Sequence, residues 1–429
     1  MHGGTGMTAD IVWLQDDLRI ADNPLFHFDT APDQLLCLYV LDQHWLNTLF
    51  QEEDVARMGS ARLRFIWQSL MALRGELLKR GSDLLVRIGS PDKVVGDLAK
   101  QLNVRSIRVR QTAGLDERRY QAAVRANLPA STELQTVESG LLLAAQSLPF
   151  ASHALPTSFS AFRRQVEAQW SVPSALPAPI TLPPWPEAPR GFPALQLVCE
   201  KSADWQPDAR QGLAYVGGED AAHKRLEDYL WHQGGVATYK QTRNGLLGAY
   251  FSTRFSPWLA QGCLSARQVY GEVRRWEACH GANESSYWII FELLWREYFY
   301  HAARLEGAAL FGSRQLPISC ANFNAWRDGR TGVAFIDAAM LELKSTGWLS
   351  NRARQNVASF LVKDLNVDWR LGAAWFEHCL IDYDVASNWG NWRYIAGIGR
   401  DPRKDRHFDV LKQAEHYDPD GLYVAHWLP

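Results

Sequence analysis

Four stretches in the C-terminal half of the sequence gather side chains that could hold an anionic, aromatic ligand. The first reads YKQTRNGLLGAYFSTRFSPWLAQG, and its hydroxyl residues Ser252, Thr253 and Ser256 lie just before an expected helix. Pro257 stands at the favoured first position of that helix. Hydroxyls and free N–H groups at a helix start suit a pyrophosphate. The alternative is that Ser256 is an ordinary N-cap.

The second stretch, YWIIFELLWREYFY, places a carboxylate and aromatic rings on one helix face. Glu292, Trp295 and Phe299 recur at positions i, i+3 and i+7. An aromatic ring beside a carboxylate can stack on a nucleobase and accept a hydrogen bond from its edge. The alternative is a buried amphipathic helix in which Glu292 pairs with Arg296 one turn later.

The third stretch, GWLSNRARQNVASFLVKDLNVDWR, clusters Asn351, Arg352 and Arg354 at an expected helix start. Positive charge there opposes the helix dipole, so the cluster indicates an anionic partner. The alternative is a pair of solvated arginines, since charged side chains are common on surfaces.

The fourth stretch, LIDYDVASNWGNWRYIAGIGRDPRKDRHFD, shows little helical period and predicts a loop. Carboxylates, an amide and large aromatics in a loop suggest a site for a planar polar ligand. These residues are Asp382, Asp384, Asn388, Trp389, Trp392 and Tyr394. A local basic run follows, with Arg393, Arg400, Arg403, Lys404 and Arg406. The alternative is a solvated loop in which Asp401 and Asp405 dilute the charge.

The elements that must position these residues fall into two halves. Short apolar runs at 11–14, 35–41, 84–88, 104–109 and 134–137 predict strands, and the segments 56–80, 93–102 and 116–126 predict helices between them. Near-continuous apolar strands separated by helices indicate an α/β domain with a doubly wound parallel sheet. Later, helices are expected at 219–232, 257–262, 265–279, 285–305, 333–346, 350–365 and 370–381, and Ser265 with Gln268 predicts a capping box.

A proline-rich segment separates the two halves. The 45 residues from Pro149 to Pro193 contain ten of the 20 prolines, which predicts an extended surface connector with one short helix at 157–169. We therefore expect an α/β domain at 1–138, a linker at 139–217 and an all-helical domain at 218–429.

Composition and missing motifs exclude several classes of protein. The 45 Lys and Arg balance 47 Asp and Glu, which argues against a generally basic nucleic-acid binder. Six scattered cysteines suit a reducing compartment, and the sequence has neither a signal-peptide layout nor an apolar run long enough for a membrane span, so a cytoplasmic location without a membrane partner is expected. No dinucleotide fingerprint, P-loop, nucleophile elbow or zincin motif occurs.

Together the four stretches resemble the photolyase/cryptochrome family. YKQTRN, LPFASHALPTSFSAFRRQVE, LIDYDVASNWGNW and YDPDGLYVAHWLP are most similar to its DASH branch, and IVWLQDDLRIADNPLF resembles the family's opening motif. The resemblance implies an N-terminal α/β domain, a long connector and a helical domain that binds FAD. It implies a blue-light photolyase that repairs cyclobutane pyrimidine dimers, preferentially in single-stranded or looped DNA, with RNA as a further candidate partner and a monomeric state.

The resemblance also assigns roles to individual residues. The FAD-binding positions are Tyr239, Ser252, Thr253, Ser256, Asn351, Arg354, Asp382, Asp384 and Asn388, with Arg354 paired to Asp382 and Asn388 facing flavin N5. The DNA or lesion contacts are Arg243, Glu292, Trp295, Arg352, Tyr394 and Arg406. The residues implied in catalysis are Glu292, Asn388 and the inner electron-relay pair Trp369 and Trp392.

Three positions depart from the family's pattern. Tyr394 stands where classical photolyases have Trp, as is typical of the DASH branch. Residues 311–324, FGSRQLPISCANFN, contain no Trp or Tyr where the outer relay member is expected, so another aromatic such as Trp326 would have to replace it. Thr112 replaces an expected carboxylate, which counts against a methenyltetrahydrofolate antenna.

Two other functions remain open from the sequence. A DASH cryptochrome could act as a blue-light sensor or nucleic-acid-binding regulator without significant repair. A flavin oxidoreductase with a diffusible substrate is disfavoured, because nothing in the sequence indicates a nicotinamide site.

Overall fold

A computed structural model describes residues 8–50, 55–312, 315–400 and 407–429. Its N-terminal part contains a parallel five-stranded sheet in the order β3-β2-β1-β4-β5. The strands are β1 (Ala9–Leu14), β2 (Gln34–Asp42), β3 (Leu84–Gly89), β4 (Ser106–Arg110) and β5 (Glu133–Val137). All six residues of the central strand β1 are buried. The predicted doubly wound parallel sheet is confirmed.

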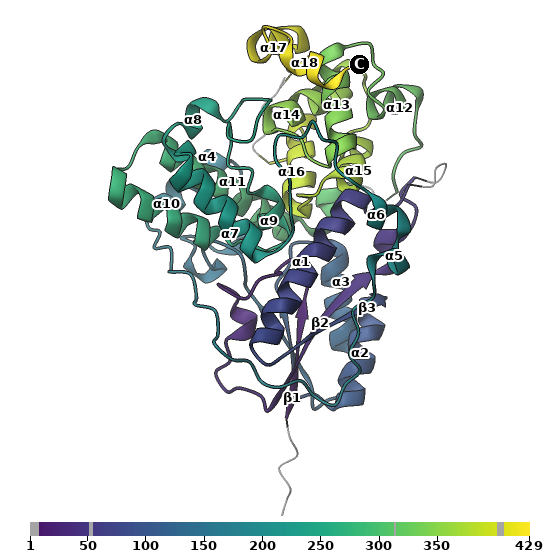
Figure 1. The fold of residues 1–429 in the computed structure, drawn as a ribbon, viewed down its shortest axis with the longest axis vertical. Helices are drawn as coiled ribbons and strands as arrows, with labels where there is room; N and C mark the ends of the chain where they lie inside the picture. The colour runs from purple at the N-terminus through teal and green to yellow at the C-terminus, as the bar shows by residue number, and fades with distance from the viewer. Residues whose placement is uncertain (1–7, 51–54, 313–314, 401–406) are drawn as a thin grey trace, which may run out of the picture.

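Helices cover both faces of the sheet (Figure 1). Val12 of β1 packs in one core with residues of α1 (Ser60–Lys79), while Ile11 packs in another with residues of α2 (Pro91–Leu102) and α3 (Leu115–Asn127). Neighbouring residues of a strand point to opposite faces, so β1 supplies both cores. The helix expected from residue 56 begins at Ser60, after Gly59 as its N-cap.

The proline-rich connector lies against the sheet domain. Its backbone bonds to the edge strand β3 and to the start of its neighbour β2: Val86 N–H donates to Gly191 O at 2.9 Å, and Leu35 N–H donates to Pro184 O at 2.9 Å. The predicted short helix is present as α4 (Phe159–Glu167), with Ser158 as its N-cap. Two further short helices in this segment are α5 (Leu195–Val198) and α6 (Glu200–Asp204).

The C-terminal half consists of helices joined by loops, with no strand among its described residues (Figure 1). Its α-helices are α7 (Glu219–Glu227), α8 (Tyr239–Thr242), α9 (Ser256–Ala260), α10 (Ala266–His280), α11 (Glu284–Glu306), α12 (Ala321–Arg327), α13 (Ala334–Thr346), α14 (Asn351–Ser359), α15 (Trp369–Cys379), α16 (Val385–Ala396), α17 (Val410–Tyr417) and α18 (Leu422–Trp427). π-helical turns at Asp228–His232 and Phe360–Asp364 extend α7 and α14. The predicted capping box of Ser265 and Gln268 opens α10.

The prediction of a loop at 382–394 is wrong, because most of this segment forms α16. Asp384 caps the helix by accepting a hydrogen bond from Ser387 N–H at 2.7 Å. Most of the helix is covered by protein: Asn388, Trp389 and Trp392 are buried, while Asn391 is exposed. Because polar and apolar residues alike are buried, the sequence lacks the one-sided pattern of a surface helix.

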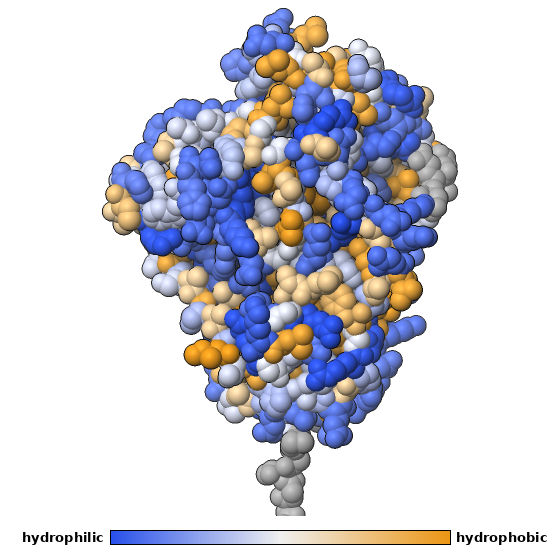
Figure 2. Space-filling model, viewed as in Figure 1, coloured by the Kyte–Doolittle hydropathy of each residue, from blue (hydrophilic) through white to orange (hydrophobic). Residues whose placement is uncertain are grey.

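The surface of the molecule mixes hydrophobic and hydrophilic residues. On the face shown in Figure 2, hydrophobic side chains are interspersed with hydrophilic ones. None of the helices in the described ranges is long and apolar enough to cross a membrane.

The sheet domain and the helical half meet closely at Gly262. Leu18 N–H donates to Gln261 O at 3.1 Å, and a guanidinium N–H of Arg19 donates to Gly262 O at 2.9 Å. Gly262 has a φ of +66°, and a Cβ added there would lie 2.2 Å from the carbonyl oxygen of Asp16. Only glycine fits this contact without displacing the backbone of the sheet domain.

Glu342 gives the helical half a pH-dependent stability. Burial raises the pKa of Glu342 to about 7, although the hydrogen bond from Tyr423 OH, at 2.5 Å, partly opposes this. Between pH 4.5 and 7 the unfolded chain ionises this carboxyl while the folded one stays protonated, so rising pH lowers the stability. We expect Glu342→Gln to gain stability relative to the parent across this range, by up to about 3 kcal/mol at pH 8.

Thermal unfolding of both proteins between pH 5 and 8 measures this difference. The same substitution at an exposed position of α11, Glu284→Gln, provides the control. A difference between Glu342→Gln and the parent that stays constant with pH would contradict the assignment.

Candidate functional site

A cavity of about 460 Å³ lies among the helices of the C-terminal half. This volume is within the range of cofactor and ligand sites. Most of the predicted site residues line it: Tyr239, Arg243, Ser252, Thr253, Ser256, Glu292, Trp295, Asn351, Arg354, Asp382, Asp384 and Tyr394. They come from segments that are far apart in the sequence, so the fold brings residues of all four predicted stretches to one place.

The hydroxyl residues lie on one side of this cavity. Ser256 is the first residue of α9, and no side chain caps that helix, so the interpretation of Ser256 as an ordinary N-cap is wrong. Its Oγ accepts a long hydrogen bond, 3.5 Å, from the indole N–H of Trp348. Ser252 and Thr253 line the same wall. The hydroxyls are thus available to a ligand rather than used for capping.

Arg254, between these hydroxyls, is a site residue that the sequence reasoning missed. It lines the cavity and is only 4% exposed, and its guanidinium carbon lies 4.0 Å from the centre of the Trp348 ring. Its φ is +53°, a strained value for a residue with a side chain, and its Nε has no hydrogen-bond partner within the described residues. The sequence signal that could have identified it is the position of this arginine between the hydroxyl residues of the segment STRFS.

The other side of the cavity is built around an ion pair. A guanidinium N–H of Arg354, on α14, donates to Asp382 Oδ2 at 2.7 Å, as the resemblance implied. Arg354 Nε–H donates to Leu349 O at 2.8 Å, which fixes the guanidinium. Asp382 Oδ1 is buried and has no partner in the part of the chain that the structure describes. A buried carboxylate oxygen left in this way is costly, so the site favours a ligand that offers an N–H group.

Glu292 and the aromatic residues form a third part of the lining. Glu292 pairs with Arg243, and Arg296 instead donates to Gly140 O at 2.9 Å, so the alternative pairing of Glu292 with Arg296 is wrong. The indole of Trp295 stacks on Phe159 of α4, with ring centres 3.7 Å apart and planes 11° apart. Tyr394 lies beside it at 6.1 Å.

Some predicted site residues lie outside the cavity lining. The side chain of Asn388 donates to Ala373 O at 3.0 Å, on the side of α16 that faces α15. Arg352 donates to Asn244 Oδ1 at 3.0 Å and covers the ring of Tyr417. Trp369 and Trp392 are buried between α15 and α16. Arg406 lies outside the described residues, as do Arg403 and Lys404.

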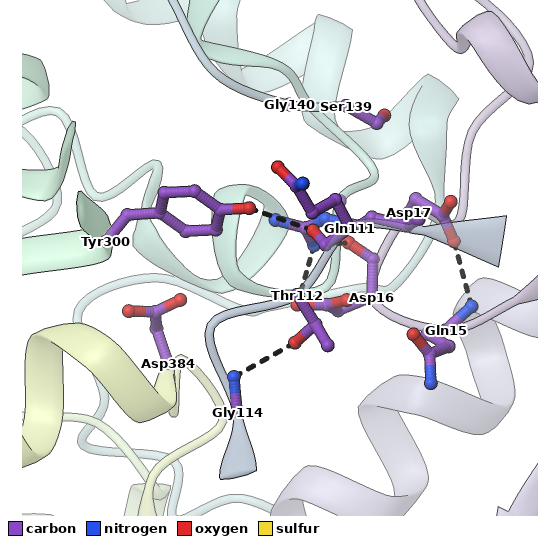
Figure 3. Close-up of polar contacts among 12 residues, drawn as sticks. Gln15, Asp16, Asp17, Gln111, Thr112, Gly114, Ser139, Gly140, Tyr300 and Asp384 are labelled. Atoms are coloured by element: carbon purple, nitrogen blue, oxygen red, sulfur yellow. Dashed lines mark hydrogen bonds and ion pairs between the residues drawn. The ribbon is translucent and has the colours of Figure 1, made fainter. Parts of the chain in front are cut away.

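Asp384 also lines a smaller cavity, of about 130 Å³, at the carboxyl ends of the strands. Figure 3 shows Asp384 on the helical side and Thr112 on the sheet side of this region. Thr112 Oγ1 accepts a hydrogen bond from Gly114 N–H at 3.1 Å, so its side chain serves the turn before α3 (Figure 3). Thr112 thus has a hydroxyl where a folate antenna would need a carboxylate. The antenna remains a prediction, and this substitution counts against it.

Comparisons with known proteins agree with this arrangement. Residues 288–429 match the family model described as the FAD binding domain of DNA photolyase, and residues 10–184 match the model described as DNA photolyase. Cryptochrome DASH of Gloeobacter violaceus is 43% identical over 429 residues, covering 98% of this chain and 85% of the relative. Cryptochrome DASH of Xenopus laevis is 42% identical over 434 residues, covering 98% and 82%.

Solved structures show the same fold. The crystal structure of the Synechocystis cryptochrome superposes with a TM-score of 0.91 at 39% identity, covering 99% of this chain and 89% of that one. A class III photolyase from Agrobacterium tumefaciens superposes with a TM-score of 0.80 at 25% identity, covering 100% and 88%.

The cavity has features that fit FAD. Hydroxyls beside the buried cation of Arg254 suit its pyrophosphate, and the free oxygen of Asp382 suits an N–H group of the flavin ring. Sequence, fold and cavity thus agree along nearly the whole chain: it belongs to the photolyase/cryptochrome family, its curated relatives are DASH cryptochromes, and its cofactor is FAD.

Proposed function

We propose that this protein is a blue-light photolyase that repairs cyclobutane pyrimidine dimers, preferentially in single-stranded DNA. One observation carries the proposal: a single cavity is lined both by the residues suited to FAD and by Glu292, Trp295 and Tyr394. A lesion against these three side chains would share the cavity with the flavin. FAD, when bound and reduced, supplies the light-driven electron that opens the cyclobutane ring.

The chain's own residues would bind and orient the lesion. Trp295 offers a broad indole beside Tyr394, and stacking on such rings does not depend on sequence. Glu292 offers a carboxylate to the polar edge of a pyrimidine, and Arg243 holds that carboxylate in place.

The preference for single strands follows from the cost of extruding the lesion. Removing a base from a duplex costs a few kcal/mol, and a single strand avoids this cost. Tyr394 offers less stacking area than the Trp of classical photolyases, so this site recovers less of that cost.

Repair by chemically reduced protein tests the function. The FAD-loaded protein is reduced without oxygen, mixed with a single-stranded oligonucleotide that carries one thymine dimer, and illuminated with blue light. We expect loss of the dimer, at a higher rate than in the matching duplex. Fully reduced, FAD-loaded protein that repairs neither substrate would contradict the proposal and favour a sensor or regulator.

Glu292→Ala should lower repair while leaving the FAD content unchanged. A hydrogen bond to a charged group contributes about 1.5–3 kcal/mol, so we expect repair at low substrate concentration to fall roughly 10- to 100-fold. Glu284→Ala, on the same helix but exposed and paired with Lys240, is the matched control and should repair as the parent does. Loss of FAD from Glu292→Ala would mean that Glu292 supports the cofactor rather than the lesion.

A further inference from the structure

The segment that should carry the outer relay aromatic lines a second, larger cavity between the two domains. This interdomain cavity, of about 500 Å³, is lined by residues 315–319, which include Leu316 and Ile318 but no Trp or Tyr. An electron vacancy that reaches Trp369 finds no oxidisable Trp or Tyr ring in this segment to fill it.

Trp389 reaches the same interdomain cavity from α16. Its ring lies edge-to-face with Trp369, with centres 5.7 Å apart, and it lines the cavity at 6% exposure. The ring of Trp392, three residues later on the same face of α16, packs directly on Gly372 of α15, where an added Cβ would lie 2.2 Å from it. Trp369 is three residues before Gly372, so the three indoles follow the interface of the two helices.

Two hydrogen-bonding groups surround the indole N–H of Trp389. It lies 3.2 Å from the hydroxyl of Tyr383 and 3.3 Å from Glu377 Oε2. Tyr383 OH in turn donates to Glu377 Oε2 at 2.9 Å. Glu377 Oε1 accepts from a guanidinium N–H of Arg57 at 2.9 Å, and all four residues line the interdomain cavity.

The environment of Tyr383 keeps its phenol protonated until a proton can move to Glu377. Burial and the nearby Glu377 raise the pKa of Tyr383 well above its usual value. The phenol therefore carries its proton at neutral pH, and the carboxylate it already contacts is positioned to accept that proton when the ring is oxidised.

Trp326 offers a poorer end point. It lies edge-to-face with Trp392 at 6.1 Å but is fully buried. Its N–H donates to the backbone carbonyl of Val357 at 2.9 Å, and a carbonyl cannot take up the proton of an oxidised indole. An electron vacancy on Trp326 has no route to a reductant outside the protein.

We propose that Trp389, with Tyr383 and Glu377, replaces the outer relay tryptophan and forms the outer end of the relay, where electrons enter from the interdomain cavity. Trp392 gives one electron to the light-excited flavin and becomes a cation radical. Trp369 and then Trp389 refill the vacancy in turn. Tyr383 gives an electron to Trp389 and its proton to Glu377, which leaves a neutral tyrosyl radical. A small thiol in the interdomain cavity gives a hydrogen atom to Tyr383 and becomes a thiyl radical, and Glu377 returns its proton to water.

This inference rests on the proposed place of the flavin, and transient spectroscopy of oxidised, FAD-loaded protein tests it. After a blue flash we expect a tryptophan radical that converts into a tyrosyl radical in the parent. Trp389→Phe should form no tyrosyl radical. Its stable photoreduction by a small thiol should be at least tenfold slower than in the parent. Tyr383→Phe, which removes one oxygen atom, should keep the tryptophan radical and lose only its conversion. Trp326→Phe is the matched control and should behave as the parent.

Each outcome bears on the relay separately from repair. Parent-like radicals and photoreduction in Trp389→Phe, or their loss in Trp326→Phe alone, would overturn the relay. FAD content and unfolding temperature verify each variant, and Tyr383→Phe decides the matter if Trp389→Phe loses FAD. Repair by the chemically reduced parent needs no relay. Failure of that repair would overturn the photolyase function, and the radical measurements would still test the role of Trp389.

Discussion

Arg354→Ala should yield protein that has lost nearly all of its FAD. The guanidinium of Arg354 is the ion-pair partner of Asp382, whose side chain is only 1% exposed. Removing one partner of a buried pair costs about 3–5 kcal/mol, because the other charge stays buried. A free-energy cost of this size in the FAD-bound protein lowers its affinity for FAD by a factor of about 100 or more. The ratio of flavin to protein absorbance after purification measures the effect.

Arg352→Ala is the matched control for this change. Arg352 lies two residues earlier on α14, but its guanidinium contacts Asn244 and the ring of Tyr417 rather than the cavity. This variant should keep its FAD and lose affinity for DNA, since the resemblance to the family implies a DNA contact at this position. Equal loss of FAD from both variants would show that α14 as a whole was disturbed, and retention of FAD by Arg354→Ala would refute the assigned role.

Gly262→Ala should destabilise the whole protein more than any exposed substitution. The added Cβ would meet the backbone of Asp16 at 2.2 Å, and backbone cannot rotate away as a side chain can. The left-handed φ of +66° adds strain. We expect a loss of about 3 kcal/mol or more and an unfolding temperature lower by several degrees.

Gly421→Ala separates the two causes of that loss. Gly421 has the same φ of +66°, but a Cβ there would meet nothing within 4 Å. Its substitution should therefore show the backbone strain alone, of about 1 kcal/mol. If Gly262→Ala were no worse than Gly421→Ala, the contact between the domains would be looser than described.

The parts of the fold that were predicted are those whose signals are local. The apolar run of β4 lies between the helical segments α2 and α3, and that pattern is enough to indicate a buried parallel strand. Ser265 and Gln268 carry the whole capping box within four residues. The pairing of Arg354 with Asp382 spans 28 residues, and only the resemblance to a family suggested it.

The parts that were missed depend on contacts between distant segments. The helix α16 buries Asn388 and Trp389, whose polar atoms bond to Ala373 and Glu377 of α15. Read alone, such a mixture of amides and indoles resembles a loop. The place of Arg254 in the site depends on a left-handed backbone conformation, which nothing in the neighbouring sequence indicates.

The stacking of Phe159 on Trp295 makes the proline-rich connector part of the surface that would meet a nucleic acid. The ring of Phe159, from outside the helical half, already covers one face of the Trp295 indole, so only the rest of the indole surface can contact a ligand. A fragment that starts at residue 218 would expose the covered face to water and give Trp295 a different selectivity. The surface around Trp295 is therefore built by residues beyond the range 288–429 that matches the family model, because it includes Phe159 of α4.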